Sequence, residues 1–264
     1  MAALSLVLMI PLALWLGQNL LMHAWGRGWA WRPDAGRLPS AARQINRVLT
    51  NVILAGTLVG YPLCRGQAPT TYYGQFFPDT GRAAEALFGA AAAVLYLALL
   101  YLAWLVSDNV RFERRLAPRR LLRRLLSVPL NAVLVALMEE LLFRGVLLAG
   151  LLEWLSPPAA ISVGVLIFAA AHYLRPVKRY WTFPGHVALG ILLCLTFWWS
   201  GALWLPIGIH AGGVLVLMMM RPFIRYTGPA WLVGASIFPY AGAVGMAALV
   251  ALTINMYWAF GGRS

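Results

Sequence analysis

The chain has few acidic residues, little charge of either sign and almost no cysteine. Its 264 residues include only 8 Asp and Glu against 21 Lys and Arg, and charged residues make up 11% of the total, whereas soluble domains usually carry about 25%. Two cysteines, Cys64 and Cys194, exclude a disulfide-rich scaffold, and no CxxC-type metal signature occurs. We expect no disulfide between them and expect Cys194 to be a small buried apolar residue.

Long apolar runs make up much of the chain. Hydrophobic residues make up 61% of the chain and the mean hydropathy is +0.74. A helix that crosses a bilayer needs about 20 mostly apolar residues. The segments that fit this description cover residues 2–22, 48–64, 83–106, 125–152, 158–174, 186–200, 201–220 and 230–258. The sequence therefore predicts an all-α polytopic membrane protein of about eight transmembrane helices.

These runs form one predicted membrane domain over residues 1–264, with the candidate core at about 125–220. No internal repeat, low-complexity tail or separate soluble domain is visible. The first run has no basic region before it and no small-residue cleavage site, so we expect it to be a retained anchor.

The formal net charge of +13 would suit nucleic-acid binding, but the basic residues are unevenly distributed. Most of them lie in the loops between runs one and two, three and four, five and six, and seven and eight: Arg27, Arg32, Arg37, Arg43 and Arg47; Arg111, Arg114, Arg115, Arg119, Arg120, Arg123 and Arg124; Arg175, Lys178 and Arg179; Arg221 and Arg225. Such alternation follows the positive-inside rule. It predicts cytoplasmic basic loops, both termini outside and no nucleic-acid partner.

Two loops carry further signals. In residues 111–126 arginine alternates with leucine, which suits a segment on the inner membrane surface with its basic face on anionic lipid headgroups. An ordinary cytoplasmic loop with topology-fixing charges explains the same pattern. The loop 65–82 contains Tyr72, Tyr73, Phe76 and Phe77, which suit an aromatic belt at headgroup level.

Three ionisable residues stand inside the fourth run: Glu139, Glu140 and Arg144. Each such group near the centre of a membrane helix costs about 2.5–3.5 kcal/mol on insertion scales. On an α-helix Glu140 and Arg144 share a face, at i and i+4, and are predicted to form an ion pair. Glu139 points about 100° away. One carboxylate is then neutralised and the other is left for chemistry.

Two histidines also fall inside apolar runs. His172 and His210 lie on other spans than the glutamates, whereas His23 and His186 are expected at membrane interfaces. At about 1.5 Å per residue, Glu139 lies about 15 Å from the inner face and His210 about 14 Å from the outer face. Both are near the midplane of a core about 30 Å thick. The sequence thus predicts one shared intramembrane polar site.

Such a site suits the activation of water. A carboxylate can act as general base, a histidine can help to hold the water, and a second histidine can donate to a developing oxyanion. This is amide hydrolysis without a covalent intermediate. No GxSxG nucleophile elbow and no HExxH zinc motif occurs in the sequence.

Glu139-Glu140-x-x-x-Arg144, Phe168-x-x-x-His172 and His210 resemble the three motifs of the CAAX protease and bacteriocin-processing enzyme family (CPBP). These are glutamate-type intramembrane endopeptidases, also known as abortive-infection proteins. The resemblance covers mainly residues 125–220. It implies that Glu139 is the general base, His172 its partner in holding water and His210 an oxyanion-stabilising residue, with Glu140 and Arg144 as a structural pair. It also implies a membrane-anchored peptide substrate, such as a CAAX-like peptide, a leader or a C-terminal sorting tag.

One position departs from the family pattern. The third motif usually continues HxxxN or HxxxD, but the fourth residue after His210 is Val214. Valine cannot donate a hydrogen bond, and the loss of one oxyanion donor typically costs about 10²–10³ in rate. The backbone N–H of Gly212 or Gly213, or the side chain of Asn255, are candidate substitutes.

Other functions remain open from the sequence. Glu139, His172 and His210 could ligate a catalytic zinc ion, although no cofactor is the first expectation. Intramembrane carboxylates and histidines also build proton relays and transporters, although no related halves are visible. Val214 also suits a non-catalytic immunity or binding protein. The composition, rich in alanine, arginine and tryptophan, suggests a bacterial inner-membrane protein.

Overall fold

The structure is a computed structural model. It describes residues 2–31, 33–34, 38–113, 116–173, 180–234 and 238–263. Several residues used in the charge argument lie outside this part of the chain, namely Arg32, Arg37, Arg114, Arg115, Arg175, Lys178 and Arg179, as does residue 174 at the end of the fifth predicted span.

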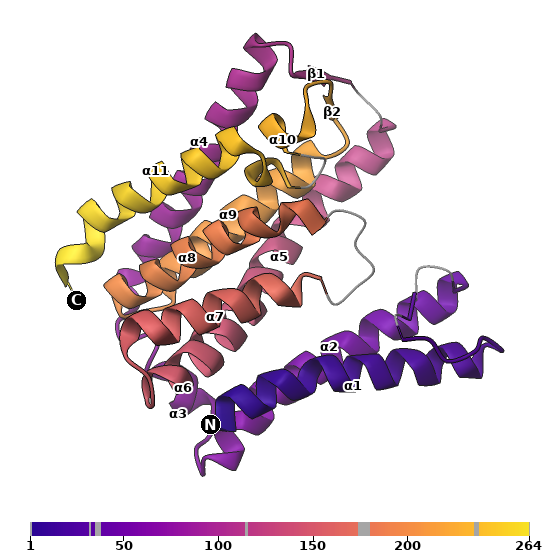
Figure 1. Ribbon diagram of the computed structural model, residues 1–264, viewed down its shortest axis with the longest axis vertical. Coiled ribbons are helices and arrows are strands. Elements are labelled where there is room, and N and C mark those ends of the chain that lie inside the picture. Colours follow the sequence, from indigo (N-terminus) through magenta and orange to yellow (C-terminus); the bar gives the residue numbers. More distant parts are fainter. Residues whose placement is uncertain are drawn as a thin grey trace. The chain divides into compact units, whose positions relative to one another are not determined.

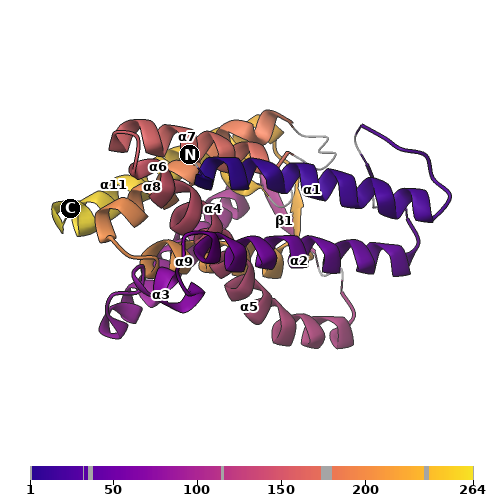
Figure 2. The same ribbon diagram turned by 90° about the horizontal axis from the view of Figure 1, so that it is seen from below.

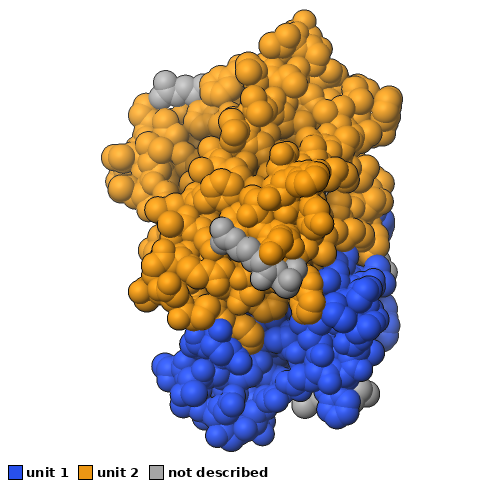
Figure 3. All heavy atoms as spheres, turned by 90° about the vertical axis from the view of Figure 1, so that its left-hand side faces the viewer, with its two compact units in different colours: residues 1–75, 141–180 blue, residues 76–140, 181–264 orange. Residues whose placement is uncertain are grey.

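The chain divides into two compact units, coloured in Figure 3. Unit 1 comprises residues 1–75 and 141–180, and unit 2 comprises residues 76–140 and 181–264. The prediction of one membrane domain over residues 1–264 stays a prediction.

The regular elements in the described part of unit 1 are all helices. Its elements are α1 (Ala2–Ala24), α2 (Ser40–Cys64), α3 (Pro69–Gly74), the π-helical segment η3 (Leu141–Leu148), α6 (Ala149–Leu152) and α7 (Pro157–Ala171). α1 and α2 lie side by side (Figures 1 and 2), and α1, α2 and α7 all contact η3. Gly150 allows α6 to approach α1 closely, because a Cβ there would overlap the side chain of Ala3.

Unit 2 contains most of the remaining helices and one small sheet. Its elements are η2 (Thr80–Ala83), α4 (Ala84–Val106), β1 (Val110–Phe112), α5 (Pro118–Glu140), α8 (Phe183–Ser200), α9 (Trp204–Met220), β2 (Ile224–Tyr226), α10 (Ala230–Val233), η5 (Pro239–Ala241), α11 (Ala243–Phe260) and η6 (Gly261–Arg263), and η4 (Tyr180–Thr182) begins at the unit boundary. α4 and α5 both pack on α9, and α11 packs on α8.

The predicted all-α polytopic membrane fold is confirmed. Within the described residues, five segments are long and apolar enough to cross a membrane: Ala3–Ala24, Ser40–Cys64, Thr80–Val106, Tyr180–Ser200 and Ala243–Phe260. Pro157–Ala171 and Trp204–Met220 are shorter apolar helices. Helical backbone also continues without a break from α5 through η3 to α6 and covers the predicted fourth span. Each of the eight predicted runs therefore contains a helix.

The eighth predicted span, 230–258, is wrong at its start. α10 ends after four residues at Gly234, whose φ of 74° is a conformation that favours glycine. The membrane-length helix begins only at Ala243. Hydropathy could not show this break, because the intervening residues are themselves apolar.

The aromatic loop is only partly a surface belt. Tyr72 and Phe76 are buried, contrary to the prediction. The Tyr72 hydroxyl donates a 2.8 Å hydrogen bond to the Gly145 carbonyl within unit 1. Burial raises the pKa of the Tyr72 phenol, which keeps it a neutral donor. The short helix α3 turns this residue inward, which residue type alone did not indicate.

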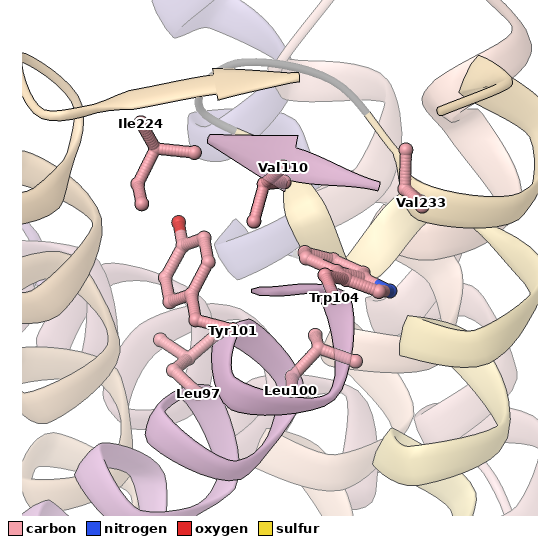
Figure 4. Packing of buried hydrophobic residues seen from close by; sticks show 7 residues of the cluster. All are labelled: Leu97, Leu100, Tyr101, Trp104, Val110, Ile224 and Val233. Carbon is pink, nitrogen blue, oxygen red and sulfur yellow. The ribbon is translucent and has the colours of Figure 1, made fainter. Parts of the chain in front are cut away.

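The main apolar cluster of unit 2 joins α4 to the two-stranded sheet. Figure 4 shows Val110 of β1 and Ile224 of β2 pointing toward side chains of α4. The cluster consists of Leu97, Leu100, Tyr101, Trp104, Val110, Ile224 and Val233, all buried. An isolated pair of strands is only marginally stable in water, so this packing is what holds the sheet in place.

Candidate active site

His210 is positioned by the way α9 packs. α9 contacts both α4 and α5. A Cβ at Gly208 or Gly212 would overlap the backbone of Ala86 or Ala90 on α4, so the two glycines let the helix backbones touch. At about 100° per residue, His210 points about 160–200° away from these glycines. One face of α9 therefore rests on α4, and the opposite face carries His210.

Glu140, the last residue of α5, meets His210 directly. The His210 Nδ1 lies 2.7 Å from the Glu140 Oε1. Glu140 is fully buried and His210 is 7% exposed. A carboxylate can only accept a hydrogen bond, so an ionised Glu140 holds the proton on Nδ1. The bond fixes both the orientation and the tautomer of the ring.

Glu139 faces the other ring nitrogen. Its Oε2 lies 3.7 Å from the His210 Nε2, and its side chain is 32% exposed. This Oε2 is itself buried and has no hydrogen-bond partner within the described residues. The spacing exceeds a direct hydrogen bond, so the two groups are arranged to share a third polar atom. Unit 2 thus holds one histidine between two carboxylates.

In unit 1, Phe168 connects the other two motif residues. The Arg144 guanidinium lies 4.6 Å from the centre of the Phe168 ring, a cation–π contact. The His172 ring lies 4.8 Å from the same ring, centre to centre. The His172 Nδ1 also donates to the Phe168 carbonyl over 2.9 Å, which leaves the lone pair on Nε2. Arg144 and Phe168 are both fully buried.

The predicted residues therefore fall into two groups. Glu139, Glu140 and His210 come together in unit 2, and Arg144, Phe168 and His172 in unit 1. The predicted pair of Glu140 with Arg144 assumed α-helical spacing. The backbone from Leu141 onward is π-helical, with i→i+5 hydrogen bonds, so that spacing does not apply there. Its role as a structural pair stays a prediction.

The suggested substitutes for the missing donor at Val214 are not supported. α9 is an unbroken helix from Trp204 to Met220, so the N–H groups of Gly212 and Gly213 lie inside it. Asn255 is exposed on α11, and its amide donates to the Ala251 carbonyl one turn earlier. Val214 itself is half-buried.

His186 is 1% exposed within the protein, and its expected place at a membrane interface stays a prediction. Its Nδ1 donates to the Thr182 carbonyl over 3.1 Å, and the Tyr240 hydroxyl donates to its Nε2 over 3.1 Å. The position of His186 at the start of a predicted helix did not indicate its contact with Tyr240, which lies 54 positions away in the sequence. Cys194 is buried as expected, and neither cysteine is joined in a disulfide.

The described residues contain no group of three or more His, Cys, Asp or Glu side chains arranged to hold a metal ion. The apolar helices and the carboxylate–histidine–carboxylate set among them define a polytopic integral membrane protein with a polar cluster of Glu139, Glu140 and His210.

Comparison with known families gives one match. Residues 121–216 match the family described as type II CAAX prenyl endopeptidase Rce1-like. The resemblance to the CAAX protease and CPBP family seen in the sequence is thus confirmed over this segment, which contains every motif residue named above. No curated protein and no solved structure matches the chain.

Proposed function

We propose that the protein hydrolyses a peptide bond in a membrane-anchored substrate with a water activated by Glu139. The observation that carries this proposal is the position of Glu139, whose Oε2 lies 3.7 Å from the His210 Nε2. A carboxylate and an imidazole at that spacing can both contact one reacting group.

The side chains then take different roles. Glu139 removes the proton from the attacking water, and His172 accepts a hydrogen bond from that water through Nε2. His210 donates from Nε2 to the oxyanion as it forms. Glu140 is a positioning residue: its negative charge at Nδ1, 2.7 Å away, stabilises the imidazolium form in which Nε2 also donates. Arg144, which lies on Phe168 in unit 1, keeps the structural role that the family resemblance implies.

Val214 favours a second candidate, a family member with a weak or inactive site. Where the pattern has Asn or Asp, valine supplies no donor. An oxyanion then receives fewer hydrogen bonds, and the loss of one donor typically lowers the rate by about 10²–10³-fold. Such a protein would bind a membrane peptide, or serve as an immunity or proton-relay protein, without efficient turnover.

The substrate and the orientation belong to the same proposal. A bacterial composition favours a leader peptide or a C-terminal sorting tag over a prenylated CAAX peptide. The basic loops would face the cytoplasm across an inner membrane, with both termini outside.

The test is a set of single changes: Glu139→Ala, Glu140→Ala, Arg144→Ala, His172→Ala and His210→Ala. N- and C-terminal peptides are mapped across the proteome of matched cells for each. We expect at least one cleavage that disappears in Glu139→Ala and His172→Ala while both proteins stay folded. Glu153→Gln, an exposed glutamate paired with Arg65, is the matched control and should keep it. If all five variants retain every cleavage product, the protein is not this peptidase.

Two further measurements separate the alternatives. Val214→Asn should raise turnover about 10²-fold if the missing donor limits the rate, and should do nothing in a purely binding protein. Activity that survives strong chelators, together with metal analysis of the purified protein, would argue against a zinc peptidase.

A further inference from the structure

Exposed arginines gather at the end of unit 2 where α4 and α9 finish. In the described part of this unit they come from β1, from the start of α5, from the end of α9 and from β2: Arg111, Arg119, Arg120, Arg123, Arg221 and Arg225. We refer to these six residues as the basic end. The proposed peptidase chemistry uses none of them.

The sheet sets two of these arginines opposite each other. Arg111 of β1 pairs in register with Arg225 of β2. Successive side chains of a strand alternate between faces, and Val110 and Ile224 occupy the face on the apolar cluster (Figure 4). Arg111 and Arg225 therefore stand on the other face, which points away from the core.

Like charges directly opposite each other in a sheet are destabilising. Arg225 has one acidic neighbour, with its Nη1 3.1 Å from the Glu113 Oε1, but both side chains of this pair are largely exposed. Exposed ion pairs contribute little. A negatively charged ligand between the arginines would remove the repulsion that the fold itself leaves.

The first turns of α5 extend the basic surface. At about 100° per residue, Arg119, Arg120, Arg123 and Arg124 fall within about 140° of arc. The leucines at positions 121, 122, 125 and 126 fall on the opposite arc, and three of them are exposed by 49–73%. A helix with one arginine face and one exposed leucine face suits the boundary between headgroups and acyl chains.

The contact of Arg124 with α9 places the start of α5 beside the end of α9. Both its Nε and its Nη2 donate to the Met218 carbonyl in the last turn of α9. The preceding arginines therefore lie within about 7.5 Å of the end of α9, measured along α5. β1 and β2 each begin four residues after the helix before them ends. The headgroup layer is itself about 5–7 Å deep on each side of a bilayer.

We propose that the basic end is a docking surface for anionic phospholipid headgroups, with the Arg111–Arg225 pair and the arginine face of α5 contacting lipid phosphates. The inference is independent of the proposed peptidase activity. It adds the sheet to the surface and excludes Arg124, which caps α9 instead.

Native mass spectrometry of the full chain tests this. The protein, in detergent with equal phosphatidylglycerol and phosphatidylcholine, is compared with the triple variant Arg119→Gln, Arg120→Gln, Arg123→Gln and with the double variant Arg111→Gln, Arg225→Gln. One arginine near a membrane surface is worth about fivefold in binding to anionic lipid. We expect a preference for phosphatidylglycerol that falls about 100-fold in the triple variant and about 20-fold in the double variant.

Further controls keep the result decisive. Arg→Lys at positions 119, 120 and 123 preserves charge and should preserve the preference. The variant Arg27→Gln, Arg43→Gln, Arg47→Gln in unit 1 changes the net charge as much as the triple variant does. It should keep most of the preference for phosphatidylglycerol. An equal loss in that control, or full retention in the triple variant, overturns the proposal. If the variants do not fold, salt supplies the test, because the wild-type preference must fall as ionic strength rises. Competition by an acidic peptide instead of lipid would identify a protein partner and equally reject it.

Discussion

The two units place their buried ionisable side chains against different kinds of neighbour. In unit 2, the Glu140 Oε1 lies 2.7 Å from the His210 Nδ1. In unit 1, Arg144 lies 4.6 Å from the centre of the Phe168 ring, and His172 packs on the same ring. The first contact is a directional hydrogen bond, and the second is packing on an aromatic surface.

This difference indicates a structural role for Phe168, the phenylalanine of the second motif. Phe168 is fully buried, and its ring contacts Phe143, Arg144 and His172. It is not a generic core residue, because it is the shared support of two polar groups. Substitutions in unit 1 and in unit 2 should therefore lower the folding stability by different amounts.

The largest effect is expected from Phe168→Ala in unit 1. Removal of a buried aromatic ring typically costs about 3–5 kcal/mol of folding free energy. Phe168→Leu keeps much of the volume but loses the cation–π contact, which is worth about 2 kcal/mol when desolvated. Unfolding in mixed micelles, followed by circular dichroism, measures both. A Phe168→Leu protein as stable as the wild type would mean that the ring acts only as filler.

In unit 2, substitutions of the two adjacent glutamates should differ in how much they lower stability. Glu140→Ala leaves a buried histidine without its carboxylate, and breaking such a pair costs about 3 kcal/mol or more. Glu139 is 32% exposed at its side chain and makes no direct bond to His210, so Glu139→Ala should cost less than about 1 kcal/mol. The same unfolding assay applies. Equal losses would show that the two carboxylates are not distinct in role.

The glycines of α9 offer a finer test of how His210 is held. A Cβ at Gly208 or Gly212 would overlap the backbone of α4, whereas nothing lies within 4 Å of one at Gly213. Gly212→Ala should cost about 1–3 kcal/mol through overpacking, and Gly213→Ala should be neutral or slightly stabilising. Histidine side-chain NMR would follow the His210–Glu140 bond in both. An undisturbed His210 signal in Gly212→Ala would contradict positioning by close packing.

The smallest effect is expected at the exposed ion pair of unit 1. Arg65 and Glu153 approach to 2.8 Å, with side chains 36% and 44% exposed. Exposed pairs are worth less than about 1 kcal/mol, so Glu153→Gln should barely change the unfolding midpoint. A loss comparable to that of Glu140→Ala would remove the distinction between buried and exposed charge.

The all-α membrane class followed from the sequence, because a membrane span needs only length and apolarity. The short sheet did not follow, since three-residue strands in an arginine-rich loop give no alternating pattern. The described part of segment 111–126 contains β1 and the start of α5, and its place on the membrane surface stays a prediction. The break after Gly234 was also missed, because hydropathy does not register a backbone turn within apolar residues.

The sequence singled out the buried ionisable residues but not their partners, and their membership of one site stays a prediction. Ionisable residues inside apolar runs are costly enough to indicate Glu139, Glu140, Arg144, His172 and His210 without structural help. Which of them meet depends on tertiary packing. The contact of Glu140 with His210 spans 70 positions in the chain, and helical periodicity could suggest only the local partner Arg144. The burial of His186 against Tyr240 was missed for the same reason.

The close contact of α9 with α4 limits how this protein can evolve. Gly208 and Gly212 sit against Ala86 and Ala90, and Gly89 on α4 sits against the backbone of α9. A descendant that enlarges any one of these three glycines must reshape the partner helix in the same lineage, although none of them is a motif residue. Small residues at these positions, changing only in concert, would therefore mark the relatives that hold their histidine in the same way.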